Sequence, residues 1–346
     1  MLKRILKNCL LVVLASSINA PVIAADISAT VNGRTRAWLE SVAVKDGSST
    51  MQMKADGRLG GSVSAESGSW TTTAFQNMDL DSDAGNAGPT ILDQKITLGN
   101  DSLDITLGRF SPYGVSKGMA YAVGPISDDA AFWVGENVPT TDVTNHLTVD
   151  VKELGLTVIY ALNNYGDAGN DARNETMIGA VYGKVFGTVD LAVEVLSASS
   201  AIDEKDKDAT KGGDYDGAAF GSLALGVGYA ISNKMGVAIN YESNSNTAGT
   251  SGAKADKNSI IELWFDLGFD DISGISVGYA TKVNDKESAN VGQSTLISLA
   301  FLIRLGIANL YTNFLSITEK DDDDDDDDDG VDDAVTNVAA GIEVNF

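Results

Sequence analysis

The final residues of the chain alternate strictly between apolar side chains and polar or small ones. The apolar set is Val338, Ala340, Ile342, Val344 and Phe346, and the positions between them hold Ala339, Gly341, Glu343 and Asn345. A period of two places alternate residues on opposite faces of a β-strand, so one face of this segment meets an apolar medium. That medium is either a protein core or lipid.

Strand-like segments recur along the whole chain. They are bounded by tight polar or glycine-containing connections, as expected for hairpins. We expect about sixteen strands, each of roughly the ten residues that cross a bilayer at a tilt. Their expected ranges are 27–39, 50–64, 70–80, 92–99, 102–110, 146–151, 156–163, 175–186, 188–197, 218–230, 235–243, 259–269, 275–283, 295–305, 307–317 and 336–346.

Short and long connections alternate between these segments. Gly187 and Gly306 are tight turns, whereas 198–217 and 244–258 are long and polar. This alternation is typical of a transmembrane barrel with short periplasmic turns and long external loops. Proline cannot donate to a strand ladder, and every proline after the N-terminal segment falls in a connection: Pro89, Pro112, Pro125 and Pro139. We therefore predict an all-β fold, a sixteen-stranded antiparallel transmembrane β-barrel.

The N-terminus has the pattern of a secretory signal peptide. Lys3, Arg4 and Lys7 precede an apolar run over 10–14, and small residues lead to cleavage after Ala24 or Ala25. Residues 1–24 are thus predicted to be signal peptide and 25–346 a single barrel domain. The only cysteine, Cys9, lies in the removed segment, so the mature chain has no thiol or cysteine metal ligand.

The mature chain is strongly acidic. Loss of the three positive charges of the signal peptide changes the formal net charge from −25 to −28. Such a charge argues against nucleic acid and anionic lipid surfaces as partners. No later stretch approaches the roughly 18 apolar residues that a membrane helix requires, so helical insertion is excluded.

Several segments resemble the trimeric general porins of Gram-negative bacteria. A terminal strand ending on Phe346 resembles the assembly signal of outer-membrane barrels, which implies the barrel-assembly machinery as a partner. The long connection after Phe110 resembles the third porin loop, which folds into the barrel and narrows the channel. Its entry, Leu107-Gly108-Arg109-Phe110, is similar to the porin pattern in which a Gly-Arg pair ends the preceding strand.

The resemblance implies a constriction with cations on the wall and carboxylates on the facing loop. Alternation places Arg109 with Ile105 and Leu107, and a bulge at Gly108 would turn it inward to the constriction, as the family pattern requires. The further wall candidates, on the polar faces of their strands, are Arg34, Arg36, Lys54, Arg58 and Lys95. The porin loop-tip motif Pro-Glu-Phe-Gly-Gly is absent, and the acidic loop candidates are Asp128, Asp129 and Glu136.

Two other features are compatible with different chemistry. The run 321–329 consists of consecutive aspartates in the last long loop, and it is interpreted as a solvated surface segment. The alternative is diffuse binding of calcium or magnesium by carboxylates that include Asp321, Asp323, Asp325, Asp327 and Asp329. His146, the only histidine, opens a strand, where a structural role is favoured over a catalytic or metal-binding one.

The sequence therefore predicts an outer-membrane porin of a Gram-negative bacterium. By the resemblance it is a homotrimer in contact with membrane lipid and lipopolysaccharide, and it passes ions and small hydrophilic solutes by passive diffusion. We expect no enzymatic activity and no cofactor. The alternative is a surface structural or adhesion protein whose barrel anchors acidic, divalent-cation-binding loops. The sequence does not decide whether cations or anions are preferred, because the acidic external loops favour cations and the basic side chains that face the lumen favour anions.

Overall fold

The chain forms one closed β-barrel. The computed structural model describes residues 27–44, 47, 49–80, 90–110, 115–122, 146–167, 170–202, 219–247, 256–285, 292–320 and 333–346. Within these residues all the regular elements are strands, and no helix is long and apolar enough to cross a membrane. Residues 1–26, which include the predicted signal peptide, lie outside the described part.

Sixteen strands make up the described barrel. They are β1 (Ile27–Val44), β2 (Thr50–Ser67), β3 (Trp70–Asp79), β4 (Thr90–Gly99), β5 (Leu103–Arg109), β6 (His146–Val151), β7 (Leu156–Asp167), β8 (Asn170–Phe186), β9 (Val189–Ile202), β10 (Ala219–Ser232), β11 (Met235–Thr247), β12 (Asp256–Gly268), β13 (Ser273–Asp285), β14 (Gly292–Leu305), β15 (Ala308–Lys320) and β16 (Asp333–Asn345). Each strand pairs with its neighbours in sequence, and β1 pairs with β16 to close the ring.

The predicted strands are confirmed, and many are longer than predicted. β1 continues to Val44 rather than residue 39, and β11 continues to Thr247 rather than residue 243. The extension of β11 reads Asn-Ser-Asn-Thr. Hydrophobic alternation requires one face to meet an apolar medium, and polar residues occupy both faces of this extension. The pattern therefore ends before the hydrogen-bonded ladder does.

The first and last strands are joined in antiparallel register. Arg36 lies opposite Glu343, and Ala37 lies opposite Ile342. Beyond β16, the backbone N–H of Gly33 donates to the Phe346 carbonyl at 2.8 Å, and the Phe346 N–H donates back to Gly33 at 3.0 Å. The terminal aromatic thus contributes to closure of the ring. Since a closed sheet has no edge, every strand has two partners.

The strand faces divide as the alternation predicts. On β2, Met51 and Met53 are 77% and 76% exposed and point outward, whereas Lys54 and Asp56 lie on the inward face. The outward set continues around the barrel with Ile96, Leu107, Val195 and Ile297. An apolar exterior around a charged interior is the pattern of a barrel surrounded by lipid.

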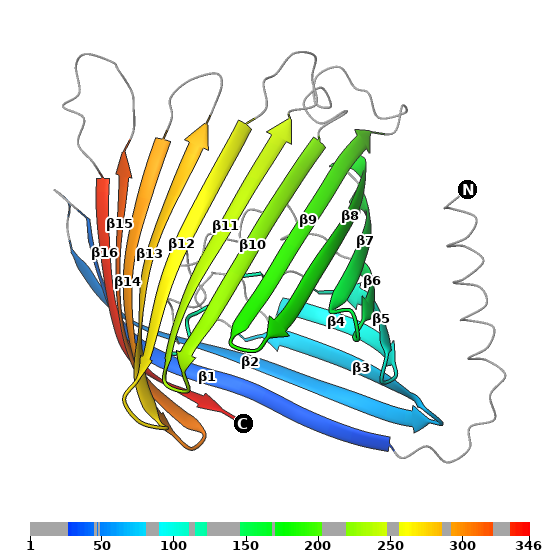
Figure 1. Ribbon diagram of the computed structural model, residues 1–346, viewed down its shortest axis with the longest axis horizontal. Helices are drawn as coiled ribbons and strands as arrows, with labels where there is room; N and C mark the ends of the chain where they lie inside the picture. Colours follow the sequence, from blue (N-terminus) through cyan, green and yellow to red (C-terminus); the bar gives the residue numbers. More distant parts are fainter. Residues whose placement is uncertain are drawn as a thin grey trace.

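Strand inclination differs around the barrel. Figure 1 shows that β1, β2 and β3 are far more inclined than β9 to β13.

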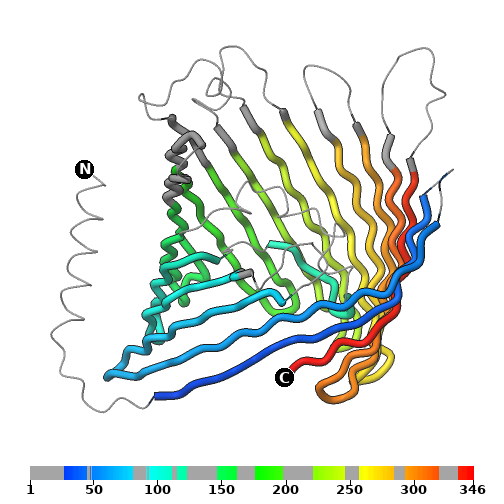
Figure 2. The backbone as a smooth tube through the Cα atoms, turned by 180° about the vertical axis from the view of Figure 1, so that it is seen from behind, coloured from blue at the N-terminus to red at the C-terminus, as the bar shows by residue number. Residues whose placement is uncertain are grey.

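Tight connections join strands at one end of the barrel. In one of them Gly187 adopts a φ of 64°, a backbone conformation that favours glycine. The same tight turns gather at one end of the barrel in the reverse view of Figure 2.

Candidate functional site

Cationic side chains line the inward face of β1 and β2, as the sequence predicted. Arg34 and Arg58 lie directly opposite each other in the register of the two strands. One nitrogen of Arg34 lies 3.8 Å from Asp56, and another lies 3.9 Å from Glu343. The Nε of Arg58 lies 3.7 Å from Asp79. These separations exceed hydrogen-bond length, so the pairs interact mainly through charge.

Arg36 and Lys54 have closer carboxylate partners. The Arg36 Nε donates to Asp56 at 2.5 Å, and its guanidinium lies 5.1 Å from the centroid of the Trp38 ring. Arg36 is only 5% exposed, so removal of that carboxylate would leave a buried charge with less compensation. The Lys54 Nζ lies 2.5 Å from Glu40, one strand away. The inward orientation predicted for these cations is confirmed, and their role in a constriction stays a prediction.

Lys95 on β4 lies in a different environment. Its Nζ is 5.3 Å from the centroid of the Phe75 ring and 5.2 Å from that of Phe110. Phe110 in turn packs against His146, with ring centroids 5.5 Å apart, and His146 is almost fully buried. Within the described ranges no carboxylate forms an ion pair with Lys95. Its charge is therefore balanced by aromatic faces, which attract cations less strongly than a carboxylate does.

The position of Arg109 corrects the expectation of an inward bulge. β4 and β5 pair in unbroken register, with Gln94 opposite Arg109 and Ile96 opposite Leu107. Ile96 and Leu107 are both more than half exposed on the outer surface. Gly108 does have a φ of 149°, but it faces inward opposite Lys95 and adds no extra residue to the strand. Arg109 therefore points outward, so its guanidinium does not face the lumen.

Part of the long connection after Phe110 lies against the inner wall. The Lys117 N–H donates to the Asn240 Oδ1 at 2.7 Å, and the Asn240 Nδ2 donates to the Lys117 carbonyl at 3.0 Å. The Ala120 N–H donates to Asp266 at 3.1 Å, and Arg304 donates to the Ala120 carbonyl at 2.9 Å. Residues 115–122 thus follow the interior of β11 to β14 (Figure 2). Asp128, Asp129 and Glu136 lie outside the described residues, as does the tract 321–329.

Small residues on the inner wall make room for this segment. A Cβ at Gly226 would overlap the carbonyl oxygen of Val115, and a Cβ at Gly274 would overlap the ring of Tyr121. Val115 is 1% exposed and packs in one cluster with Ile260. The sequence predicted a polar lumen and did not reveal that residues 115–122 pack against this part of the wall. The signal was present as glycines at inward positions of β10 and β13, where a water-filled lumen does not require them.

Carboxylates on the opposite wall were also not predicted. Glu194, Glu242 and Glu262 project inward from β9, β11 and β12, and each is at most 1% exposed. In the ring order these strands lie halfway around from β1 to β4. Asn240, which holds Lys117, also donates to Glu262 at 3.2 Å. One side of the lumen thus carries cations together with their carboxylate partners, and the other side carries buried carboxylates. The segment 115–122 lies on this second side.

Removal of the Lys95 charge should change ion selectivity, whereas removal of the Arg109 charge should not. We expect Lys95→Met to raise the permeability ratio of potassium to chloride about twofold, since a lumenal cation that contacts aromatic rings rather than a described carboxylate attracts anions. Arg109→Met removes the same charge from the outer face and serves as the matched control. Reversal potentials in a salt gradient measure both. Equal shifts in the two variants would contradict the assignment of the two faces.

Comparisons with known proteins identify the fold but no sequence relative. The chain matches no protein-family model and no curated protein. It is similar to the anion-selective porin from Comamonas acidovorans, with a TM-score of 0.68 and 15% identity over 93% of this chain and 100% of that one. It also resembles the outer membrane channel DcaP of Acinetobacter baumannii, with a TM-score of 0.64 and 12% identity over 92% and 97%.

A further similar structure is the trimer form of OmpT, an outer membrane protein of Vibrio cholerae. Its TM-score is 0.64, with 10% identity over 92% of this chain and 100% of that one. At these identities the likeness shows the architecture alone. The chain therefore has the fold of the sixteen-stranded Gram-negative porins.

Proposed function

We propose that this protein is an outer-membrane porin that passes ions and small hydrophilic solutes by passive diffusion. The observation that carries the proposal is the division of the closed barrel, whose exterior is apolar and whose interior carries opposed charges. Fixed charges on facing walls create a transverse field, which orients dipolar solutes and sets ion preference together with the pore diameter. The proposal requires no cofactor, no energy coupling and no enzymatic step.

Assembly and location form part of the same proposal. Similar barrels come from outer membranes, and one of them is described as a trimer, which supports a homotrimer in the outer membrane of a Gram-negative bacterium. Phe346 is 59% exposed beside the closing strand pair, an accessible position for recognition by the assembly machinery. Lipid and lipopolysaccharide would contact the apolar exterior. Cation binding by the tract 321–329 stays a separate prediction.

Solute flux through liposomes tests the function. Liposomes that contain the folded protein should swell in an isosmotic solution of a small sugar and should not swell in a solution of a large dextran. Protein-free liposomes, and liposomes with heat-denatured protein, provide the controls. A folded, membrane-inserted barrel that admits neither solute would contradict the porin proposal and would favour the adhesion alternative.

A further inference from the structure

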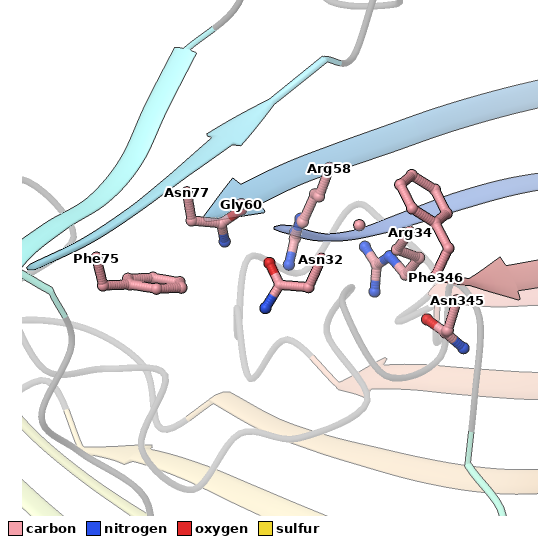
Figure 3. A pocket seen from close by; sticks show the side chains of 9 residues that line it. Asn32, Arg34, Arg58, Gly60, Phe75, Asn77, Asn345 and Phe346 are labelled. Carbon is pink, nitrogen blue, oxygen red and sulfur yellow. The ribbon is translucent and has the colours of Figure 1, made fainter. Parts of the chain in front are cut away.

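A recess opens in the lumenal wall where β1, β2 and β3 meet. Its volume is about 350 Å³. Figure 3 shows arginine and asparagine side chains around it, with the Phe75 ring at one end. Its lining includes the inward side chains of Asn32, Arg34, Arg58, Phe75, Asn77 and Asn345, and Phe346 at the end of the chain also borders it. Gly60 lies between Asn32 and Asn77.

The two arginines are held together although their charges repel. Arg34 and Arg58 occupy directly opposed positions, a pairing that is unfavourable between like charges. Arg34 forms ion pairs with Asp56 and Glu343, and Arg58 forms one with Asp79, and none of these three carboxylates lines the recess. Asp56 also makes a hydrogen bond with the Nε of Arg36. An anion between the two guanidiniums would accept charge-assisted hydrogen bonds and would reduce the part of their repulsion that these ion pairs leave.

The neighbouring row of the wall is uncharged and polar. Asn32 lies opposite Gly60, and Gly60 lies opposite Asn77. A Cβ at Gly60 would come within 2.5 Å of the Asn32 Oδ1 and 3.5 Å of the Asn77 Oδ1, so glycine keeps the space between the two amides open. The recess therefore extends between the amide groups of Asn32 and Asn77, and a side chain at position 60 would fill this space.

The far end of the recess is aromatic. Phe75 lies two residues before Asn77 on the inward face of β3, and the Lys95 ammonium lies 5.3 Å from the centroid of its ring. A solute with a carboxylate at one end and an apolar body would meet the arginines with the first and the phenyl face with the second. Lys95 adds positive potential at that same end.

We propose that this recess binds the carboxylate of small organic anions and retains them during passage through the channel. The inference rests on the proposed porin function and names a solute class for it. Two guanidiniums can hold a planar carboxylate through paired N–H donors, whereas a halide cannot use that geometry. A cation of the same shape would be repelled.

Benzoate is the probe, and benzylammonium is its counterpart of similar shape and opposite charge. In planar bilayers in potassium chloride, benzoate should interrupt the wild-type current in a concentration-dependent way, and benzylammonium should not. Gly60→Val fills the recess without changing charge and should weaken benzoate block about tenfold. Gly61→Val, on the outer face of the same strand, should leave the block unchanged.

A charge variant provides a second, independent arm. Arg58→Met should also weaken benzoate block about tenfold, because one charge-assisted pair of donors is lost. Arg109→Met removes an equal charge from the outer face and should have no effect. Block that is equal in wild type, Gly60→Val and Arg58→Met would overturn the site. Potassium chloride currents without any benzoate block would overturn the site and leave the porin function intact, whereas absence of all current would overturn the porin function itself.

Discussion

Replacement of Gly226 by alanine should displace the segment 115–122 from the inner wall. The added Cβ would coincide with the carbonyl oxygen of Val115, so the segment and the strand cannot both keep their positions. Overpacking of this kind costs about 1–3 kcal/mol, which corresponds to a roughly tenfold rise in the displaced population. The strand itself should tolerate alanine, because its ladder on both sides is otherwise unchanged.

Chemical labelling measures this displacement directly. The mature chain is predicted to lack cysteine, so Val115→Cys introduces a single thiol at a position that is 1% exposed. We expect slow labelling of that thiol by a polar methanethiosulfonate reagent in the parent barrel. In the Gly226→Ala background labelling should be about tenfold faster.

Gly228→Ala is the matched control for this experiment. It lies two residues along the same inward face, and its Cβ would meet Lys117 at 3.5 Å, an ordinary contact distance. Labelling of the thiol introduced by Val115→Cys should therefore stay slow in the Gly228→Ala background. Equally fast labelling in both alanine variants, or slow labelling in both, would contradict the close packing of Val115 on Gly226.

Neutralisation of Asp56 should have the largest effect among the lumenal charges. Asp56→Asn removes the hydrogen-bonded partner of Arg36, which is 5% exposed, and also one ion-pair partner of Arg34. Loss of one partner from a buried ion pair costs roughly 3–5 kcal/mol, so the temperature of barrel unfolding should fall. The gain of one net positive charge in the lumen should also raise the permeability ratio of chloride to potassium about threefold.

The control for this variant is the same substitution in an exposed ion pair. Asp104→Asn removes the partner of Lys152, which lies 2.8 Å away beside a tight turn, and both side chains are about one third exposed. Exposed pairs contribute about 0–1 kcal/mol, so unfolding and selectivity should change little. Heat-induced loss of the folded band in gel electrophoresis and reversal potentials compare the two variants. Similar effects of both substitutions would contradict the special position of Asp56.

The fold was predictable because strand alternation is a local property. Each inward charge on β1 and β2 was placed by counting from its neighbours, and the closed ring confirms those faces for Arg34 and Arg58. The same alternation places Arg109 on the outer face. Alternation alone predicted its outward face, and the porin pattern was the reason to expect a bulge that the register does not contain.

The site was less predictable because it combines segments that are distant in sequence. Lys117 and Asn240 are 123 residues apart, and their contact depends on how the connection enters the barrel. The buried carboxylates Glu242 and Glu262 lie on strands whose position across the lumen follows only from ring closure. Glycines on the inward faces were the local signal that residues 115–122 pack against the wall. They could be interpreted only after the structure showed which segment covers them.

Current through single barrels, combined with cysteine scanning along β2, tests the central claim most directly. The wild-type protein should give stable conducting steps in planar bilayers. In single-cysteine variants, a bulky methanethiosulfonate reagent should reduce the step at the inward positions Arg58, Gly60 and Ser62 and leave it unchanged at the outward positions Leu59, Gly61 and Val63. Absence of conducting steps from folded protein, or equal reduction at both sets of positions, would contradict a water-filled channel lined by this face.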